Sequence, residues 1–234
     1  TYDLGPGRHA LRAEVAAVRV GVGRWFGWWA VAVFARGYAA DIRADGLKTG
    51  GLPHGLDFVQ PGDMETIATP TDFIGLNYYA RHIYRANEAG NDPQTIFPSP
   101  AGPENWTEMG WEIYPAGLAR VLGRIYFDYQ PLKIYVTENG ASYSTPPAAD
   151  GHVPDLQRLN YLKNHFAAAH RALQAGVPLA GYFVWSLVDN FEWSKGYSQR
   201  FGLTWVDYQT QQRILKDSAL WYAKVIAQNA VETE

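Results

Sequence analysis

The chain has 234 residues, of which 47% are hydrophobic and 18% are charged. This balance favours a folded domain with a sizeable core and argues against intrinsic disorder. The formal net charge of -3, without a cluster of Lys and Arg, argues against a nucleic-acid-binding surface. The sequence has no cysteine, which excludes disulfides and thiol chemistry and favours a reducing, cytoplasmic compartment.

Aromatic residues make up 15% of the chain, including nine Trp and fifteen Tyr. Most of them are expected in the core, but flat aromatic faces also suit the apolar faces of sugar rings. Only their positions can separate these two interpretations. The apolar run at residues 25–35 is about half the length of a membrane span, so no membrane segment is predicted.

The N-terminal stretch is the hardest part of the sequence to interpret. Residues 10–20 fit a helix, and residues 24–34 form a dense aromatic and apolar block without a clean period. The first clear strand is predicted at residues 73–79, and it turns polar at Asn77.

Two helices and a strand are predicted next. Pro115 opens a helix in which Leu118 and Leu122 recur at helical spacing. A strand follows at residues 134–137, and then a polar loop at residues 141–154. Asp155 is predicted to cap the second helix. Its apolar stripe consists of Leu159, Leu162, Phe166, Ala169 and Leu173.

A third strand is predicted at residues 181–187, a short run at 201–206, and a final helix around Leu220 and Val225. Strands that alternate with helices indicate an α/β fold with a parallel sheet. The long loops after the strands favour a barrel with an elaborated catalytic face. A doubly wound sheet is the alternative, but no strand is followed by the glycine-rich turn of dinucleotide-binding proteins.

Two of the apolar runs end in a carboxylate, Glu138 within residues 134–140 and Glu192 within residues 181–193. In a parallel α/β barrel, catalytic residues lie at the carboxyl ends of the strands. Each of these carboxylates is therefore a candidate catalytic or binding group.

These segments, together with others, resemble glycoside hydrolase family 1, the retaining β-glucosidases and β-galactosidases. The matching segments are residues 24–26, 58–63, 73–79, 135–140 and 182–207. The resemblance implies part of a (β/α)8 TIM barrel, with the three strands as its sixth, seventh and eighth. It also implies a single truncated domain over residues 1–234, with an atypical segment at 1–47 and barrel units six to eight at 48–234.

The resemblance implies a catalytic role for two residues. Glu138, in Thr-Glu-Asn-Gly, matches the nucleophile, which forms a covalent glycosyl ester. Tyr79 matches the tyrosine that donates a hydrogen bond to that carboxylate and keeps it ionised. Asn77 matches a polar residue that lines the same pocket, although a strand-end turn would also explain it.

Four further residues match the family's sugar-binding positions. Glu192 and Trp193 resemble the pair that binds the glycone, Trp185 resembles the floor beneath the ring, and Phe201 resembles a wall of the pocket. A purely structural role is the alternative for each aromatic residue. A carboxylate at position 192 would repel a phosphate, so the implied substrate is a neutral β-glycoside.

The family's general acid/base is missing from the sequence. It lies in an Asn-Glu-Pro motif, whereas the only Asn-Glu pair here, at residues 87–88, is followed by Ala. Glu112 and Asp189 are candidate substitutes without support from spacing. General-acid assistance typically contributes about 10²–10⁴-fold, so glycosides with activated leaving groups could react without it.

Three functions therefore remain open: a β-glycosidase, a non-catalytic sugar-binding remnant, and a fragment that is active only with a complementary N-terminal half. Three strands would leave two open sheet edges, which predicts self-association or a complementary barrel fragment as partner. No cofactor or metal is expected, because His54, His82 and His165 are scattered without ligand spacing.

Overall fold

The computed structural model describes residues 28–34, 37–38, 40–51, 54–85, 95–97 and 100–231. The helix predicted at residues 10–20 lies outside the described residues. The chain divides into two compact units, one of residues 1, 73–81 and 100–234, the other of residues 2–72 and 82–99. All the candidate site residues lie in the first of these units. The division of a single domain at residue 47 stays a prediction.

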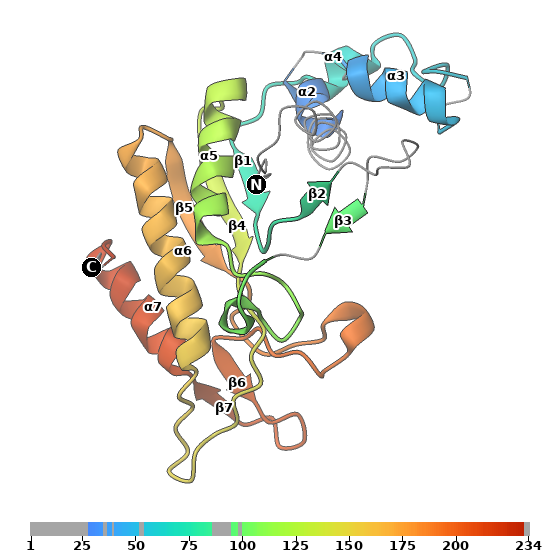
Figure 1. The fold of residues 1–234 in the computed structure, drawn as a ribbon. Helices are drawn as coiled ribbons and strands as arrows, with labels where there is room; N and C mark the ends of the chain where they lie inside the picture. Colours follow the sequence, from blue (N-terminus) through green and yellow to red (C-terminus); the bar gives the residue numbers. More distant parts are fainter. Residues whose placement is uncertain are drawn as a thin grey trace. The chain divides into compact units, whose positions relative to one another are not determined.

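The first unit is built on a three-stranded parallel sheet in the order β1-β4-β5 (Figure 1). The strands are β1 (Ile74–Asn77), β4 (Ile134–Asn139) and β5 (Leu179–Val184). Their first residues pair across the sheet, since Ile134 is in register with both Ile74 and Leu179. The predicted α/β fold with a parallel sheet is confirmed. Within the part of the chain that is described, these strands do not close a barrel.

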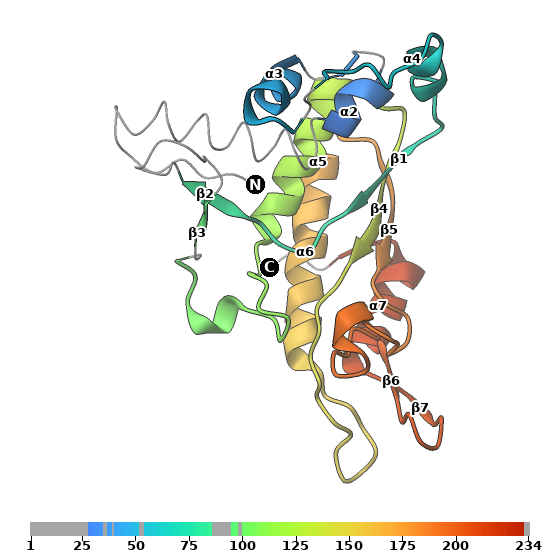
Figure 2. The ribbon, with the colours of Figure 1, turned by 90° about the vertical axis from the view of Figure 1, so that its right-hand side faces the viewer.

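Helices α5 (Pro115–Tyr129) and α6 (Leu156–Gln174) lie side by side against one face of this sheet (Figures 1 and 2). Helix α7 (Asp217–Gln228) packs along α6. The residues between helices and sheet are apolar and almost completely buried, namely Leu118, Leu122, Ile125, Ile134, Val136 and Leu162. The predicted stripe on α6 is correct at Leu162, Phe166 and Ala169, whereas Leu173, near the last turn, is exposed.

The predicted capping role of Asp155 is wrong, although Asp155 does occupy the N-cap position of α6. Its carboxylate makes no bond to the N–H groups of that helix. Instead it accepts hydrogen bonds from the Ser218 N–H (2.9 Å) and Oγ (2.5 Å) in the first turn of α7. Asp155 therefore joins the starts of two helices that are far apart in sequence.

Strand β5 ends at Val184, three residues before the predicted end. Ser186 donates its N–H to Phe201 O (3.2 Å) and accepts the Leu203 N–H (2.8 Å). Because these backbone groups pair with a segment that lies later in the chain, the strand leaves the sheet. The later segment forms a hairpin of β6 (Thr204–Val206) and β7 (Arg213–Leu215), of which β7 was not predicted.

The second unit contains α2 (Trp28–Val33), α3 (Ala40–Thr49), α4 (Asp63–Ile67), and the antiparallel pair β2 (Ile83–Arg85) and β3 (Thr95–Phe97). The described part of the aromatic block is thus helical. Short 3₁₀ helices lie in the first unit at η2 (Pro103–Asn105) and η3 (Trp193–Lys195). Among the described helices, none combines the length and apolar character needed to span a bilayer.

Candidate active site

Glu138 and Tyr79 meet at the carboxyl end of the sheet. Glu138 is the penultimate residue of β4, and Tyr79 lies just beyond the end of the neighbouring strand β1. The Tyr79 hydroxyl donates a hydrogen bond of 2.8 Å to Glu138 Oε2. Parallel pairing of β1 with β4 places these two side chains together, although they are far apart in sequence.

Tyr79 is held in its protonated form. Burial, the hydrogen bond to Glu138 and the negative charges of Glu138 and Glu192 all raise the pKa of the Tyr79 hydroxyl. The hydroxyl therefore remains a donor throughout the neutral pH range. A donor directed at a carboxylate stabilises its charged form and fixes its orientation.

Aromatic rings form a wall beside this pair. Tyr79, Trp111 and Phe201 lie in a triangle with ring centroids 5.3 to 6.2 Å apart. Phe201 is 2% exposed, so it also belongs to the core. The position of Trp111 was not predicted from the sequence. Its only signal was an aromatic residue in the long loop between a strand and the following helix.

Asn77 lies one strand away from Glu138, with which it is in register. Its Oδ1 accepts a hydrogen bond of 2.7 Å from the Thr137 hydroxyl. The amide is thus oriented across the strands, at the exposed end of β1. This position fits both the predicted pocket role and the strand-end alternative.

Trp185 directly follows β5 and donates its N–H to Asn139 O (2.9 Å). Its peptide bond to Ser186 is cis. A Cβ atom on Gly140 would lie only 1.8 Å from Trp185 O. The glycine of Thr-Glu-Asn-Gly is therefore required because the backbones after β4 and β5 approach each other closely.

Glu192 and Trp193 lie at η3, in a tight turn closed by a Glu192 N–H bond of 2.7 Å to Gly196 O. Trp193 is 80% exposed. Glu192 is half-buried, and its Oε2 is buried without a hydrogen-bond partner among the described residues. Among the residues that the structure describes, no hydrogen bond or ring contact joins the side chain of Trp185 or Trp193 to Tyr79 or Glu138.

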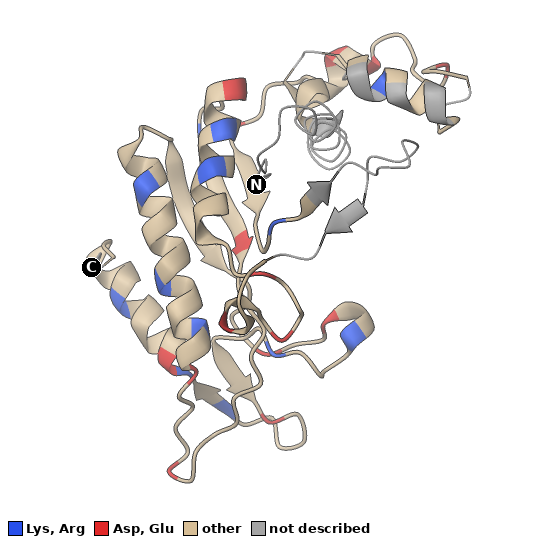
Figure 3. Ribbon diagram, in the orientation of Figure 1, with Lys and Arg blue, Asp and Glu red and all other residues tan. Residues whose placement is uncertain are grey.

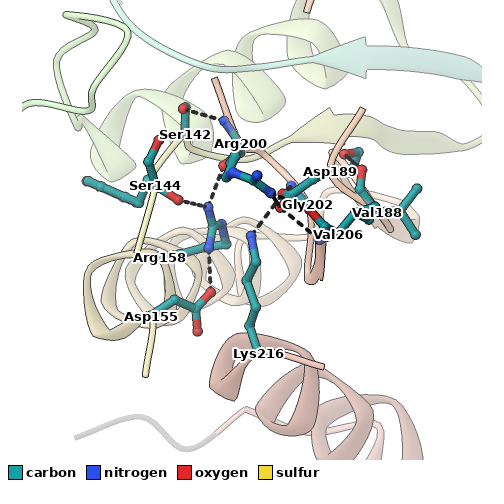
Figure 4. A network of polar contacts seen from close by, with 12 residues as sticks. Ser142, Ser144, Asp155, Arg158, Val188, Asp189, Arg200, Gly202, Val206 and Lys216 are labelled. Atoms are coloured by element: carbon teal, nitrogen blue, oxygen red, sulfur yellow. Dashed lines mark hydrogen bonds and ion pairs between the residues drawn. The ribbon is translucent and has the colours of Figure 1, made fainter. Parts of the chain in front are cut away.

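A buried ionic cluster anchors the loop that carries Glu192 (Figure 4). Asp189 binds Arg200 Nη1 at 2.7 Å and Lys216 Nζ at 2.9 Å, and it accepts the Gly202 N–H at 2.9 Å. Burial and the nearby charge of Arg158 lower the pKa of Lys216 to about 8. Both ends of the loop between Asp189 and Arg200 are thereby fixed.

Arg158 of α6 anchors the loop after β4 in the same cluster (Figure 4). Its guanidinium donates to the carbonyls of Ala141 (3.2 Å), Tyr143 (2.9 Å) and Arg200 (2.5 Å) and pairs with Asp155 (2.5 Å). A single side chain therefore joins the loops that follow β4 and β5. This cluster was not predicted from the sequence, because its members come from distant segments.

Glu112 and Asp189, the candidate substitutes for the acid/base, are both engaged in ion pairs. The two oxygens of Glu112 accept hydrogen bonds from Arg81 at 2.6 and 2.8 Å, and this pair is buried. Both oxygens of Asp189 also accept hydrogen bonds. A general acid must carry a proton to donate, so this arrangement argues against either residue in that role.

Figure 3 shows that Asp and Glu lie together with Lys and Arg in the loops beyond the carboxyl end of the sheet, whereas α5 and α6 carry mostly Lys and Arg. No group of three or more His, Cys, Asp or Glu side chains suited to a metal ion occurs in the described segments.

His165 is buried, which lowers its pKa to about 4, and its Nδ1 bonds Tyr161 O at 2.8 Å.

The sequence and the structure both match known proteins. The family model described as Glycosyl hydrolase family 1 matches residues 8–231. Beta-glucosidase A of Thermotoga maritima is 46% identical over 170 residues, which are 73% of this chain and 37% of that protein.

Two solved structures illustrate the structural match. The AHE enzyme from Alicyclobacillus herbarius superposes with a TM-score of 0.86 at 38% identity, over 98% of this chain and 49% of that one. The T. maritima beta-glucosidase in complex with castanospermine has a TM-score of 0.86 at 36% identity, over 99% and 49%. The chain thus spans about half the length of these structures and 37% of the curated relative.

Proposed function

Because the chain belongs to glycosyl hydrolase family 1, we propose that it carries the nucleophile and part of the glycone-binding wall of a retaining β-glycosidase. Glu138 is the nucleophile in this proposal, and Tyr79 orients it. The observation that carries the proposal is the 2.8 Å bond from the Tyr79 hydroxyl to Glu138 Oε2, at the carboxyl end of a parallel sheet.

The proposed reaction begins with attack of the Glu138 carboxylate on the anomeric carbon of the sugar. A bond forms between the carboxylate oxygen and this carbon, while the bond to the leaving group breaks and its electron pair departs with the leaving group. Water then cleaves the glycosyl ester and releases the sugar with its configuration retained. The Tyr79 hydroxyl keeps the attacking carboxylate oriented during the first step.

The remaining candidate residues are assigned to binding of the glycone. Glu192 accepts hydrogen bonds from sugar hydroxyls, Trp193 and Trp185 contact the ring, and Phe201 supports the aromatic wall. Asn77 contributes an amide beside the nucleophile. The Oε2 atom of Glu192 is buried without a hydrogen-bond partner among the described residues, which supports this role because such an oxygen is costly without a partner. Its negative charge favours neutral over phosphorylated glycosides.

The chain carries no Asn-Glu-Pro motif, and both Glu112 and Asp189 are engaged in ion pairs. The proposed activity is therefore limited to glycosides whose leaving group departs without protonation. On its own, the chain would hydrolyse ordinary glycosides about 10²–10⁴-fold more slowly than with a general acid.

Incubation with a 2-deoxy-2-fluoro-β-glucoside that carries a dinitrophenolate leaving group, followed by intact-mass and peptide analysis, tests the proposal. The expected result is one glycosyl adduct on Glu138. Glu138→Gln should abolish it, whereas Glu65→Gln, an exposed carboxylate on α4, should not. An adduct of equal yield in Glu138→Gln would refute the assignment.

The same experiment separates the alternatives. Saturable sugar binding without an adduct would favour a non-catalytic binding module. An adduct that forms only after addition of the N-terminal half of a family relative would favour a fragment that needs a complementary half. The chain spans about half the length of the two solved structures.

A further inference from the structure

Asn139, the residue after Glu138, is completely buried and forms hydrogen bonds in several directions. Its Nδ2 donates to Tyr78 O (2.7 Å) and to the Tyr161 hydroxyl (2.9 Å). Its Oδ1 accepts a hydrogen bond of 2.5 Å from the Tyr182 hydroxyl. Both amide hydrogens and the amide oxygen are therefore used, which fixes the orientation of the side chain.

These bonds converge on the backbone around Tyr79. The Tyr78 N–H donates to Glu138 O (2.9 Å), and the Tyr78 carbonyl accepts from Asn139. The residue that precedes Tyr79 is thus tied to β4 through both of its peptide groups. The Tyr161 hydroxyl in turn donates to the Tyr79 carbonyl at 3.3 Å.

The tyrosine hydroxyls in this network stay protonated. Burial is the first cause of the raised pKa of both Tyr161 and Tyr182. The Asn139 carbonyl also accepts the Trp185 N–H at 2.9 Å. As the last residue of β4, Asn139 therefore contacts the segments that follow both neighbouring strands, β1 and β5, and no part of the proposed chemistry uses it.

We infer that Asn139 and Tyr161 are positioning residues, which hold Tyr79 so that its hydroxyl stays directed at Glu138. The inference rests on the proposed role of Glu138 as nucleophile. The two residues act through Tyr79 and the backbone of Glu138. Removing them should change the rate of nucleophilic attack more than the affinity for the sugar, because attack depends on how accurately the carboxylate is placed.

Tyr161→Phe tests the inference, because it removes the hydroxyl but keeps the ring that stacks on His165 at 4.0 Å. Tyr222→Phe is the matched control. The Tyr222 hydroxyl also donates to a backbone carbonyl, that of Tyr182 (2.9 Å), and no hydrogen bond among the described residues joins it to Tyr79 or Glu138. Adduct formation with the fluoroglucoside gives a maximal rate constant and a dissociation constant for each variant.

Tyr161→Phe should lower the maximal rate constant about 10-fold, as expected for a lost hydrogen bond in a buried network, and should change the dissociation constant less than about twofold. Tyr222→Phe should change neither. Equal rate constants in Tyr161→Phe and the wild type would overturn the inference, as would an equal decrease in both variants.

Amide hydrogen exchange at Tyr78 supplies a readout that does not depend on reaction. Its N–H bonds to Glu138 O, so loss of positioning should accelerate its exchange about 10-fold in Tyr161→Phe and leave it unchanged in Tyr222→Phe. Unchanged exchange in Tyr161→Phe would overturn the inference. If the wild-type chain forms no adduct, the proposed function fails, and the exchange rates alone decide the positioning claim.

Discussion

His165 should make the stability of this chain depend on pH in a predictable way. His165 and Tyr161 both belong to α6, one turn apart. The His165 ring stacks on the Tyr161 ring, and its Nδ1 donates to the Tyr161 carbonyl. Its Nε2 is buried without a hydrogen-bond partner among the described residues. A proton added at Nε2 would place a charge with no compensating group in this environment, so burial lowers the pKa to about 4.

The lowered pKa sets the direction and the size of the effect. The unfolded chain binds a proton at this histidine below its ordinary pKa of about 6.5, while the folded chain does so only below about 4. The contribution of His165 to stability is therefore complete above pH 6.5 and is lost as the pH falls towards 4. A difference of about 2.5 pKa units corresponds to about 3 kcal/mol in total, of which about 2 kcal/mol is lost between pH 7.5 and 5.0.

Urea unfolding followed by Trp fluorescence at pH 7.5 and 5.0 measures this effect in the wild type and in His165→Asn, which keeps a donor near Tyr161 O but does not titrate. The wild type should lose about 2 kcal/mol more between the two pH values than the variant. His152→Asn is the control. The bond of 2.6 Å to Asp217 raises the pKa of His152, so its contribution is present below pH 6.5 and is lost as the pH rises. Equal losses in the wild type and His165→Asn would refute the reasoning.

Three substitutions test other parts of the site. In the same urea unfolding assay, Gly140→Ala should destabilise the fold by about 1–3 kcal/mol, because its Cβ would overlap a backbone carbonyl after β5. Gly123→Ala in α5 is the control. The nearest atom to its Cβ lies at 4.0 Å, so this substitution should be neutral or stabilising. Asp189→Asn should cost about 3–5 kcal/mol, because it leaves buried cations uncompensated; an unchanged unfolding midpoint would contradict this. Tyr79→Phe should slow adduct formation on Glu138 by about 10- to 100-fold, as expected for a lost bond to a charged group; an unchanged rate constant would remove Tyr79 from the mechanism.

The sequence predicted those elements whose signals are local. Strand β4 and helix α5 have apolar patterns that agree with their burial, the stripe of α6 agrees except at Leu173, and Pro115 begins α5 as expected. The meeting of Tyr79 and Glu138 followed from the resemblance and from the rule that parallel strands end at one edge. Apolar patterns, motif residues and the pairing of neighbouring parallel strands can each be recognised within one segment or one pair of strands.

The predictions from sequence were wrong or missing where residues from distant segments bond to the same backbone or side-chain groups. The end of β5 could not be predicted, because Ser186 pairs with residues near Phe201. Asp155 has the sequence features of a helix cap, yet its carboxylate accepts hydrogen bonds from Ser218 at the start of α7. The positions of Trp111 and of the ionic cluster around Asp189 could not be predicted, since each depends on contacts between separate segments.

The ionic cluster between the loops that follow β4 and β5 contains two carboxylates, Asp155 and Asp189, and three cations, Arg158, Arg200 and Lys216. With every group ionised, it carries one positive charge in excess inside the protein. Lys216 has the lowered pKa, so it is the member that releases its proton first. At mildly alkaline pH the cluster therefore becomes neutral, while Arg158 stays paired with Asp155 and Arg200 with Asp189. The contacts that hold the two loops should remain after Lys216 has lost its proton.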